Sequence, residues 1–172
     1  ETGREETTTL CLIPAVREAT TLPLIAAGGI GTGEAIFALM ALGAEGVQMG
    51  TRFALTDESS ASDIFKEYCL RLNEGDTKLL LKKLAPTRLV TNSFRDRVEA
   101  AEGRGASAEE LRELLGRGRA KKGIFEGDLE EGELEIGQVA ALFRRRQSVD
   151  EVMKELLEGY RRASDKIRSA GL

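Results

Sequence analysis

Two glycine-bearing segments of the chain have the residue types of a phosphate-binding site. Gly28-Gly29 and Gly50-Thr51 each follow a short apolar run. Glycine lets a phosphate approach the backbone N–H groups because no Cβ stands in the way, and the threonine hydroxyl adds a further donor. The two pairs lie one strand–helix–strand unit apart, so in a parallel barrel both turns end on the same face. We therefore expect both turns to direct their N–H groups at one phosphate.

The elements predicted around these pairs form a compact parallel βαβ unit, expected to be right-handed. Pro23 opens an apolar run that is typical of a short, buried parallel strand. Thr32 is the predicted N-cap of the following helix, and Gly43 is the glycine expected just past its end. The predicted segments are a helix over 7–20, a strand over 24–27, a helix over 33–42 and a strand over 45–50.

Beyond residue 56 the pattern becomes mainly helical. Ser107 with Glu110, and Ser148 with Glu151, have the spacing of capping boxes that open helices. Residues 79–81 begin a short extended or helical piece. The predicted helices cover 60–72, 93–102, 107–115, a short segment from 138, and 148–169, with a glycine-rich, charged surface loop over 116–137.

Composition excludes several classes of function. The 172 residues carry a net charge of −4, which argues against a nucleic-acid binder. No histidine is present, so Ser-His-Asp and Cys-His catalysis and histidine-ligated metal sites are excluded within these residues, and we expect no metal site. No apolar run reaches the roughly 20 residues of a membrane span, and no signal peptide opens the chain. We expect a cytoplasmic protein, with Cys11 and Cys69 as buried free thiols.

Other glycine-rich phosphate motifs do not fit. The stretch from Gly28 to Gly33 departs from GxGxxG, because Glu34 stands where the last glycine is required, and no GK[ST] ending of a P-loop follows. A Rossmann site and a P-loop are therefore rejected. The remaining alternative is that these glycines only close tight turns between strand and helix.

Longer motifs resemble the nitronate monooxygenase family, formerly called 2-nitropropane dioxygenase, which includes the flavin-type enoyl-ACP reductases. The resemblance rests on PLIAAGGI at 23–30 and LGAEGVQMGTRF at 42–53. Further similar segments are LAPTR at 84–88, GRGRAKKG at 116–123 and EGDLEEGELEIGQ at 126–138. Together they cover nearly the whole chain from Gly3 onward.

The resemblance implies an α/β fold: the C-terminal part of an FMN-binding TIM (β/α)8 barrel, followed by a mainly helical region. Residues 1–56 would form the last βα units with the phosphate-binding loops, 57–147 a region over the active-site face, and 148–172 a C-terminal amphipathic helix. Gly137-Gln138 would either approach the phosphate or simply start a helix. The implied cofactor-binding residues are Ala27, Gly28, Gly29, Gln48, Met49, Gly50 and Thr51.

The activity implied is FMN-dependent oxidation of alkyl nitronates with O2. The alternative is an enoyl-ACP reductase that uses NAD(P)H, so the expected partner is a small molecule, either a nitronate or an enoyl thioester. The family's catalytic histidine would lie just upstream of Gly3, outside this sequence. We therefore expect a truncated chain with no catalytic residue of its own, no turnover by itself, and homo-oligomerisation through unpaired strand edges. A third alternative is a non-catalytic fragment that binds FMN or phosphate, or self-associates.

Overall fold

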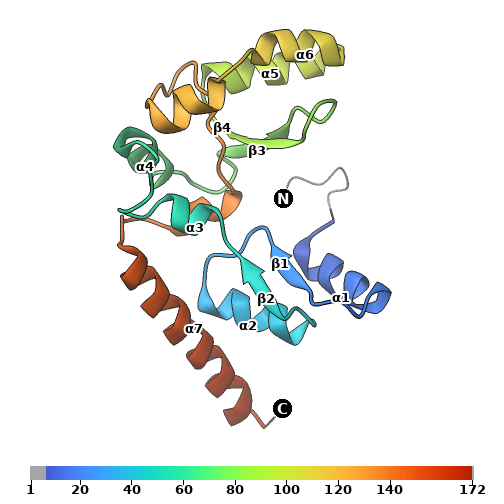
Figure 1. Ribbon diagram of the computed structural model, residues 1–172, viewed down its shortest axis with the longest axis vertical. Helices are drawn as coiled ribbons and strands as arrows, with labels where there is room; N and C mark the ends of the chain where they lie inside the picture. Colours follow the sequence, from blue (N-terminus) through green and yellow to red (C-terminus); the bar gives the residue numbers. More distant parts are fainter. Residues whose placement is uncertain (1–6, 172) are drawn as a thin grey trace.

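The computed structural model describes residues 7–171 and shows a small parallel α/β unit followed by a mainly helical region (Figure 1). The elements run in the order α1 (Thr9–Ala19), β1 (Ile25–Ala27), α2 (Gly33–Ala41), β2 (Gly46–Gln48), α3 (Thr51–Ala54), α4 (Asp63–Cys69), β3 (Thr77–Leu80), β4 (Thr87–Val90), α5 (Ser93–Gly103), α6 (Ala108–Leu115), a π-helix η1 (Lys121–Phe125), a 3-10 helix η2 (Gln138–Leu142) and α7 (Val149–Ser169).

Strands β1 and β2 pair in parallel, as the sequence predicts, with Ile25 opposite Gly46 and Ala27 opposite Gln48. Helix α2 connects them. The Thr32 side chain accepts a hydrogen bond from the Ala35 N–H at 3.2 Å and so caps α2, which satisfies one of the N–H groups left over at a helix start. The predicted βαβ unit is therefore confirmed, and its apolar core contains Ile13, Ala26, Ile30, Leu39 and Ala44.

Helix α7 lies along α2 (Figure 1). The two helices approach closely because glycine stands at the contact. A Cβ added at Gly33 would lie 2.1 Å from the Leu156 carbonyl oxygen and 2.2 Å from the Tyr160 nitrogen. Ser148 begins α7 with the predicted capping box, in which the Ser148 and Glu151 side chains each accept from the other's backbone N–H. The C-terminal helix is thus fixed at its start and along its first turns.

The second region contains a β-hairpin that the sequence pattern does not predict; it leaves only residues 79–81, at the end of the first strand, open between extended and helical structure. Strands β3 and β4 are antiparallel, with Thr77 opposite Val90 and Leu80 opposite Thr87. The expectation of a surface loop over 116–137 is wrong in two places, since residues 121–125 form the π-helix η1 and the end of the segment is buried. Leu134 is buried, and its carbonyl accepts from the Val90 N–H at 3.0 Å. Glu133, Leu134 and Ile136 are all buried, so this end of the segment belongs to the interior and not to a surface loop.

The two cysteines differ in burial. Cys69 lies in the core of the second region, and burial raises the pKa of its thiol to about 12. Cys11 is exposed, which corrects the expectation of two buried thiols. The reason is that α1 buries only Ile13 in the structure described, so its other faces lie open.

Candidate functional site

The two glycine-bearing turns open onto one cavity of about 520 Å³, named here the glycine-turn cavity. Residues 28–30 follow β1 and residues 48–51 follow β2, so both strand ends contribute to the same wall. The other wall comes from the second region, through residues 86–88 at the start of β4 and residues 135–137 before η2. The cavity therefore lies between the βαβ unit and the hairpin.

Backbone conformation explains why glycine stands in these turns. Gly28 has φ of +95° and Gly29 has φ of +69°, a region that favours glycine over residues with a Cβ. A Cβ added at Gly50 would meet no atom within 4 Å. The missing side chain at Gly50 therefore leaves open space directly beside the backbone, which suits the close approach of a ligand.

Thr51 and Gly137 join the two walls of the glycine-turn cavity. The Gly137 N–H donates a hydrogen bond to Thr51 Oγ1 at 3.0 Å. Because the hydroxyl oxygen accepts here, its own proton remains to be donated to a second partner. Helix α3 begins at Thr51, so its first N–H groups have no acceptor within the helix. Hydroxyl and backbone donors thus gather at the edge of the cavity.

Charged residues reach the cavity from the second region. Arg88 and Glu135 both line it, and an antiparallel bridge between Leu89 and Glu135 places this glutamate beside β4. Burial raises the pKa of the Glu135 carboxyl. Next to it, burial and the charge of Glu135 raise the pKa of Glu133 to about 7, against the opposing influence of Arg119.

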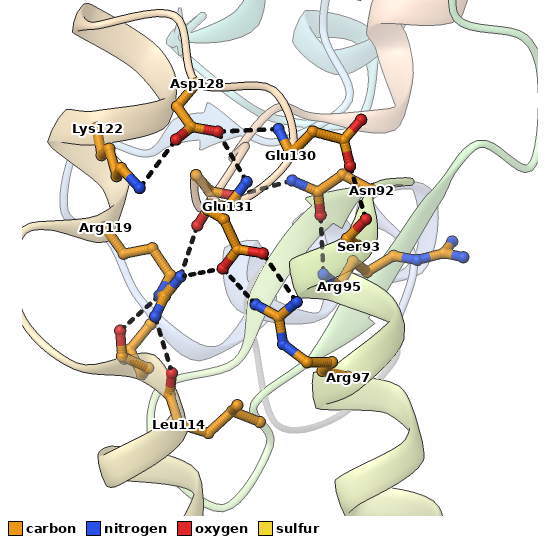
Figure 2. Close-up of polar contacts among 12 residues, drawn as sticks. Asn92, Ser93, Arg95, Arg97, Leu114, Arg119, Lys122, Asp128, Glu130 and Glu131 are labelled. Carbon is orange, nitrogen blue, oxygen red and sulfur yellow. Dashed lines mark hydrogen bonds and ion pairs between the residues drawn. The ribbon is translucent and has the colours of Figure 1, made fainter.

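Asn92 holds the segment that leads into this wall (Figure 2). Its side-chain oxygen accepts from the Arg95 N–H at 2.8 Å and caps α5. Its amide nitrogen donates to the carbonyls of Leu129, at 2.9 Å, and Gly132, at 2.8 Å. One side chain therefore starts a helix and fastens the chain that continues to Glu135 and the cavity.

Arg119 and Arg97 fasten the same segment through Glu131 (Figure 2). Arg119 donates to the carbonyl oxygens of Glu131, at 2.6 Å, and Leu115, at 2.8 Å, and its guanidinium lies 4.5 Å from the centre of the Phe94 ring. Arg97 makes two hydrogen bonds to the Glu131 carboxylate, at 2.6 and 3.0 Å. The position of the second wall thus depends on a network centred on Arg119.

Six of the seven predicted cofactor-binding residues line the glycine-turn cavity, namely Gly28, Gly29, Gln48, Met49, Gly50 and Thr51. Ala27 ends β1, is exposed, and is not among the lining residues. Gly137 lines the cavity and directly precedes η2, so it stands at a helix start as one alternative expected, and its approach to a phosphate stays a prediction. Arg88 and Glu135 were not assigned to the site from sequence. Both lie in the LAPTR and ELEIGQ motifs, which were the available signal.

Residues 7–171 show neither a metal-binding cluster nor a membrane-spanning helix. Within residues 7–171, no three or more histidine, cysteine or acidic side chains are grouped so that they could hold a metal ion. None of the helices in the same residues combines the length and the apolarity needed to cross a membrane.

The fold is that of the C-terminal part of a parallel α/β barrel, with the glycine-turn cavity at the ends of β1 and β2. Comparison with known proteins agrees. The family model of nitronate monooxygenase matches residues 1–159. A "Probable nitronate monooxygenase" of Staphylococcus aureus strain JH9 is 39% identical over 98 residues, which are 55% of this chain and 27% of that protein. The chain therefore belongs to the nitronate monooxygenase family.

Solved structures give the same fold over almost the whole chain. FabK from Thermotoga maritima superposes with a TM-score of 0.89 at 33% identity, covering 96% of this chain and 53% of that one. A nitroalkane oxidase from Streptomyces ansochromogenes superposes with a TM-score of 0.75 at 29% identity, covering 92% of this chain and 45% of that one. The chain thus spans about half the length of these structures and about a quarter of the Staphylococcus relative.

Proposed function

We propose that this chain contributes the phosphate-binding part of an FMN-dependent oxidoreductase of the nitronate monooxygenase type. The observation that carries the proposal is the convergence of the turns after β1 and β2, together with Gly137, on one cavity. The open space beside Gly50 and the positive φ angles of Gly28 and Gly29 fit a phosphate held against the backbone.

In this proposal the residues of the chain bind and orient the cofactor. The N–H groups of Gly29, Gly50 and Thr51 would hold the phosphate, and the Thr51 hydroxyl would donate to one of its oxygens. When bound, FMN supplies the redox chemistry, whereas the protein supplies position and electrostatics. The region over 57–147 would cover the mouth of the site, since Arg88 and Glu135 reach the cavity from it.

The substrate of this proposal is an alkyl nitronate, in keeping with the family model and the Staphylococcus relative. The second candidate is reduction of an enoyl thioester with NAD(P)H. It is favoured by the superposition on FabK, which has the higher TM-score of the two structures compared above. A chain that only binds FMN or phosphate without turnover is the third candidate.

Cofactor binding is the first test. The purified chain is mixed with FMN, freed of excess by gel filtration, and its visible spectrum is recorded; a retained flavin band is expected. Gly50→Val should abolish retention because its side chain would fill the space beside the backbone. Gly103→Ala is the matched control, since a Cβ there meets nothing within 4 Å and Gly103 ends α5. Equal retention by both variants would contradict the proposed cradle.

Turnover separates the candidates. Because no turnover is expected from these residues alone, the test uses a flavin-loaded protein extended upstream to include the family's catalytic histidine. It is supplied with a nitronate and O2, and separately with NADH or NADPH and an enoyl thioester. Nitronate consumption without use of nicotinamide supports the monooxygenase, and nicotinamide oxidation that requires the thioester supports the reductase. Retained flavin with neither reaction supports the non-catalytic candidate.

A further inference from the structure

A second cavity of about 530 Å³ lies next to the glycine-turn cavity and has no role in the proposed function. We call it the arginine cavity. It lies between the start of α2, the segment after η2 and the first turns of α7. Its charged lining residues are Arg52, Arg144, Arg145, Arg162, Glu34 and Glu155. The volume falls in the range of sites for small molecules.

The charges are paired at one end of the arginine cavity and not fully balanced at the other. At one end Arg162 pairs with Glu34 at 3.1 Å. At the other end Arg52 and Arg145 both pair with the single carboxylate of Glu155. Arg145 also lies 3.8 Å from the Glu151 carboxylate, so two glutamates face these two guanidinium groups.

Arg144 adds a third guanidinium group at this end. Its guanidinium donates to the carbonyl oxygens of Leu72, at 2.6 Å, and Phe143, at 3.4 Å. It makes no ion pair with any carboxylate of residues 7–171. Three guanidinium groups thus face two carboxylates at this end, which leaves one excess positive charge.

Arg52 is held rigidly and retains an unused donor. It is 7% exposed, which is rare for arginine. Its guanidinium lies over the Phe143 ring, 4.4 Å from the centroid, and Nη2 donates to Gln147 Oε1 at 2.9 Å. Its Nε is buried and has no hydrogen-bond partner in the described part of the chain. A buried, unpaired donor on a cation is costly unless an acceptor is supplied.

We propose that the arginine cavity binds the phosphate group of a phosphorylated small molecule, with Arg52, Arg144 and Arg145 as the anion-binding residues. Arginine matches the geometry of phosphate oxygens with several donors from one planar group. A phosphate would offset the excess positive charge at this end of the cavity, and its oxygens would accept hydrogen bonds from the guanidinium groups. The site is separate from the proposed FMN site, because Thr51 lines one cavity and the adjacent Arg52 lines the other.

The test uses inorganic phosphate as the probe, titrated by calorimetry into the Gly50→Val chain at constant ionic strength. This background blocks the proposed FMN-phosphate site, so any phosphate that binds must bind elsewhere. We expect saturable binding of phosphate and weaker binding of acetate. Adding Arg144→Ala and Arg145→Ala should raise the phosphate Kd at least about tenfold, because each lost charge-assisted hydrogen bond is worth about that factor or more.

Arg161→Ala with Arg168→Ala is the matched control, since both arginines lie on α7 and neither lines the cavity. It removes the same charge and should leave the phosphate Kd unchanged. Arg145→Gln alone is the milder variant if the double substitution disturbs folding, which circular dichroism will report. Absence of phosphate binding in the Gly50→Val chain, or equal effects of the two double variants, overturns the proposal. If the unaltered chain fails to retain FMN in the cofactor-binding test, the proposal of a phosphate site in the arginine cavity is not affected.

Discussion

The Gly137 N–H donates to Thr51 Oγ1 at 3.0 Å and so links two segments that are 86 residues apart in the chain. The bond connects the turn after β2 to the segment that leads into η2. It also leaves the Thr51 hydroxyl proton directed to another acceptor, which in the proposed function is a phosphate oxygen. The contact is close, since a Cβ at Gly137 would lie 2.7 Å from Thr51 Oγ1.

Gly137→Ala should therefore weaken FMN binding by about tenfold, because the added methyl must push the Thr51 hydroxyl aside. Flavin fluorescence titration measures the change. Thr51→Val should give a similar loss and Thr51→Ser should restore binding, because serine keeps the hydroxyl. If Thr51→Val binds FMN as tightly as the unaltered chain, the hydroxyl has no part in the site.

Gly33→Ala should separate α7 from α2. The new methyl would lie within 2.2 Å of backbone atoms of Leu156 and Tyr160, which cannot move without shifting the helix. We expect a loss of about 3 kcal/mol or more in the free energy of unfolding, measured by urea denaturation. Gly103→Ala should change stability by less than about 1 kcal/mol. A fully stable Gly33→Ala chain would show that α7 does not dock as described.

Glu133 should make stability depend on pH near neutrality. Burial raises its pKa to about 7, above the ordinary value of 4.5. Between pH 4.5 and pH 7 the Glu133 carboxyl therefore stays protonated in the folded state, whereas it has lost its proton in the unfolded state. Stability should fall as pH rises over this range. The fall should be about 2–3 kcal/mol.

Glu133→Gln tests this because a neutral amide removes the titration. Its stability relative to the unaltered chain should improve steadily from pH 5 to pH 8. Glu131→Gln is a control of opposite sign, since hydrogen bonding to Arg97 lowers the pKa of that carboxyl and its contribution is lost as pH falls. Parallel pH profiles for the unaltered and Glu133→Gln chains would contradict the assignment.

Arg119→Ala should loosen the wall of the glycine-turn cavity. The substitution removes hydrogen bonds to the carbonyls of Leu115 and Glu131 and the contact with the Phe94 ring. We expect a loss of about 2 kcal/mol in stability and faster amide exchange over 129–136. Arg97→Ala should cost less, because its pair with Glu131 is exposed to water. Equal losses for the two variants would argue against a central role of Arg119.

Local patterns determined much of the first region. Pro23 and the apolar run after it indicated β1, Thr32 and Gly43 indicated the ends of α2, and Ser107 and Ser148 indicated two capping boxes, all as observed. These features depend on contacts between residues near one another in the chain, so the sequence alone contains the necessary information. The glycine pairs were likewise recognisable because each sits at a strand end.

Tertiary structure decided which distant segments meet. The motifs that contain Arg88 and Glu135 were recognisable in the sequence, but they did not indicate that these residues reach the cavity. The antiparallel bridge between Leu89 and Glu135 places them there. The burial of Leu134 inside a charged, glycine-rich stretch also depends on β4 lying beside it. Arg52 shares a glutamate with Arg145 only because α7 folds back on the βαβ unit. Such contacts depend on the packing of separate elements, which periodicity and capping signals do not encode.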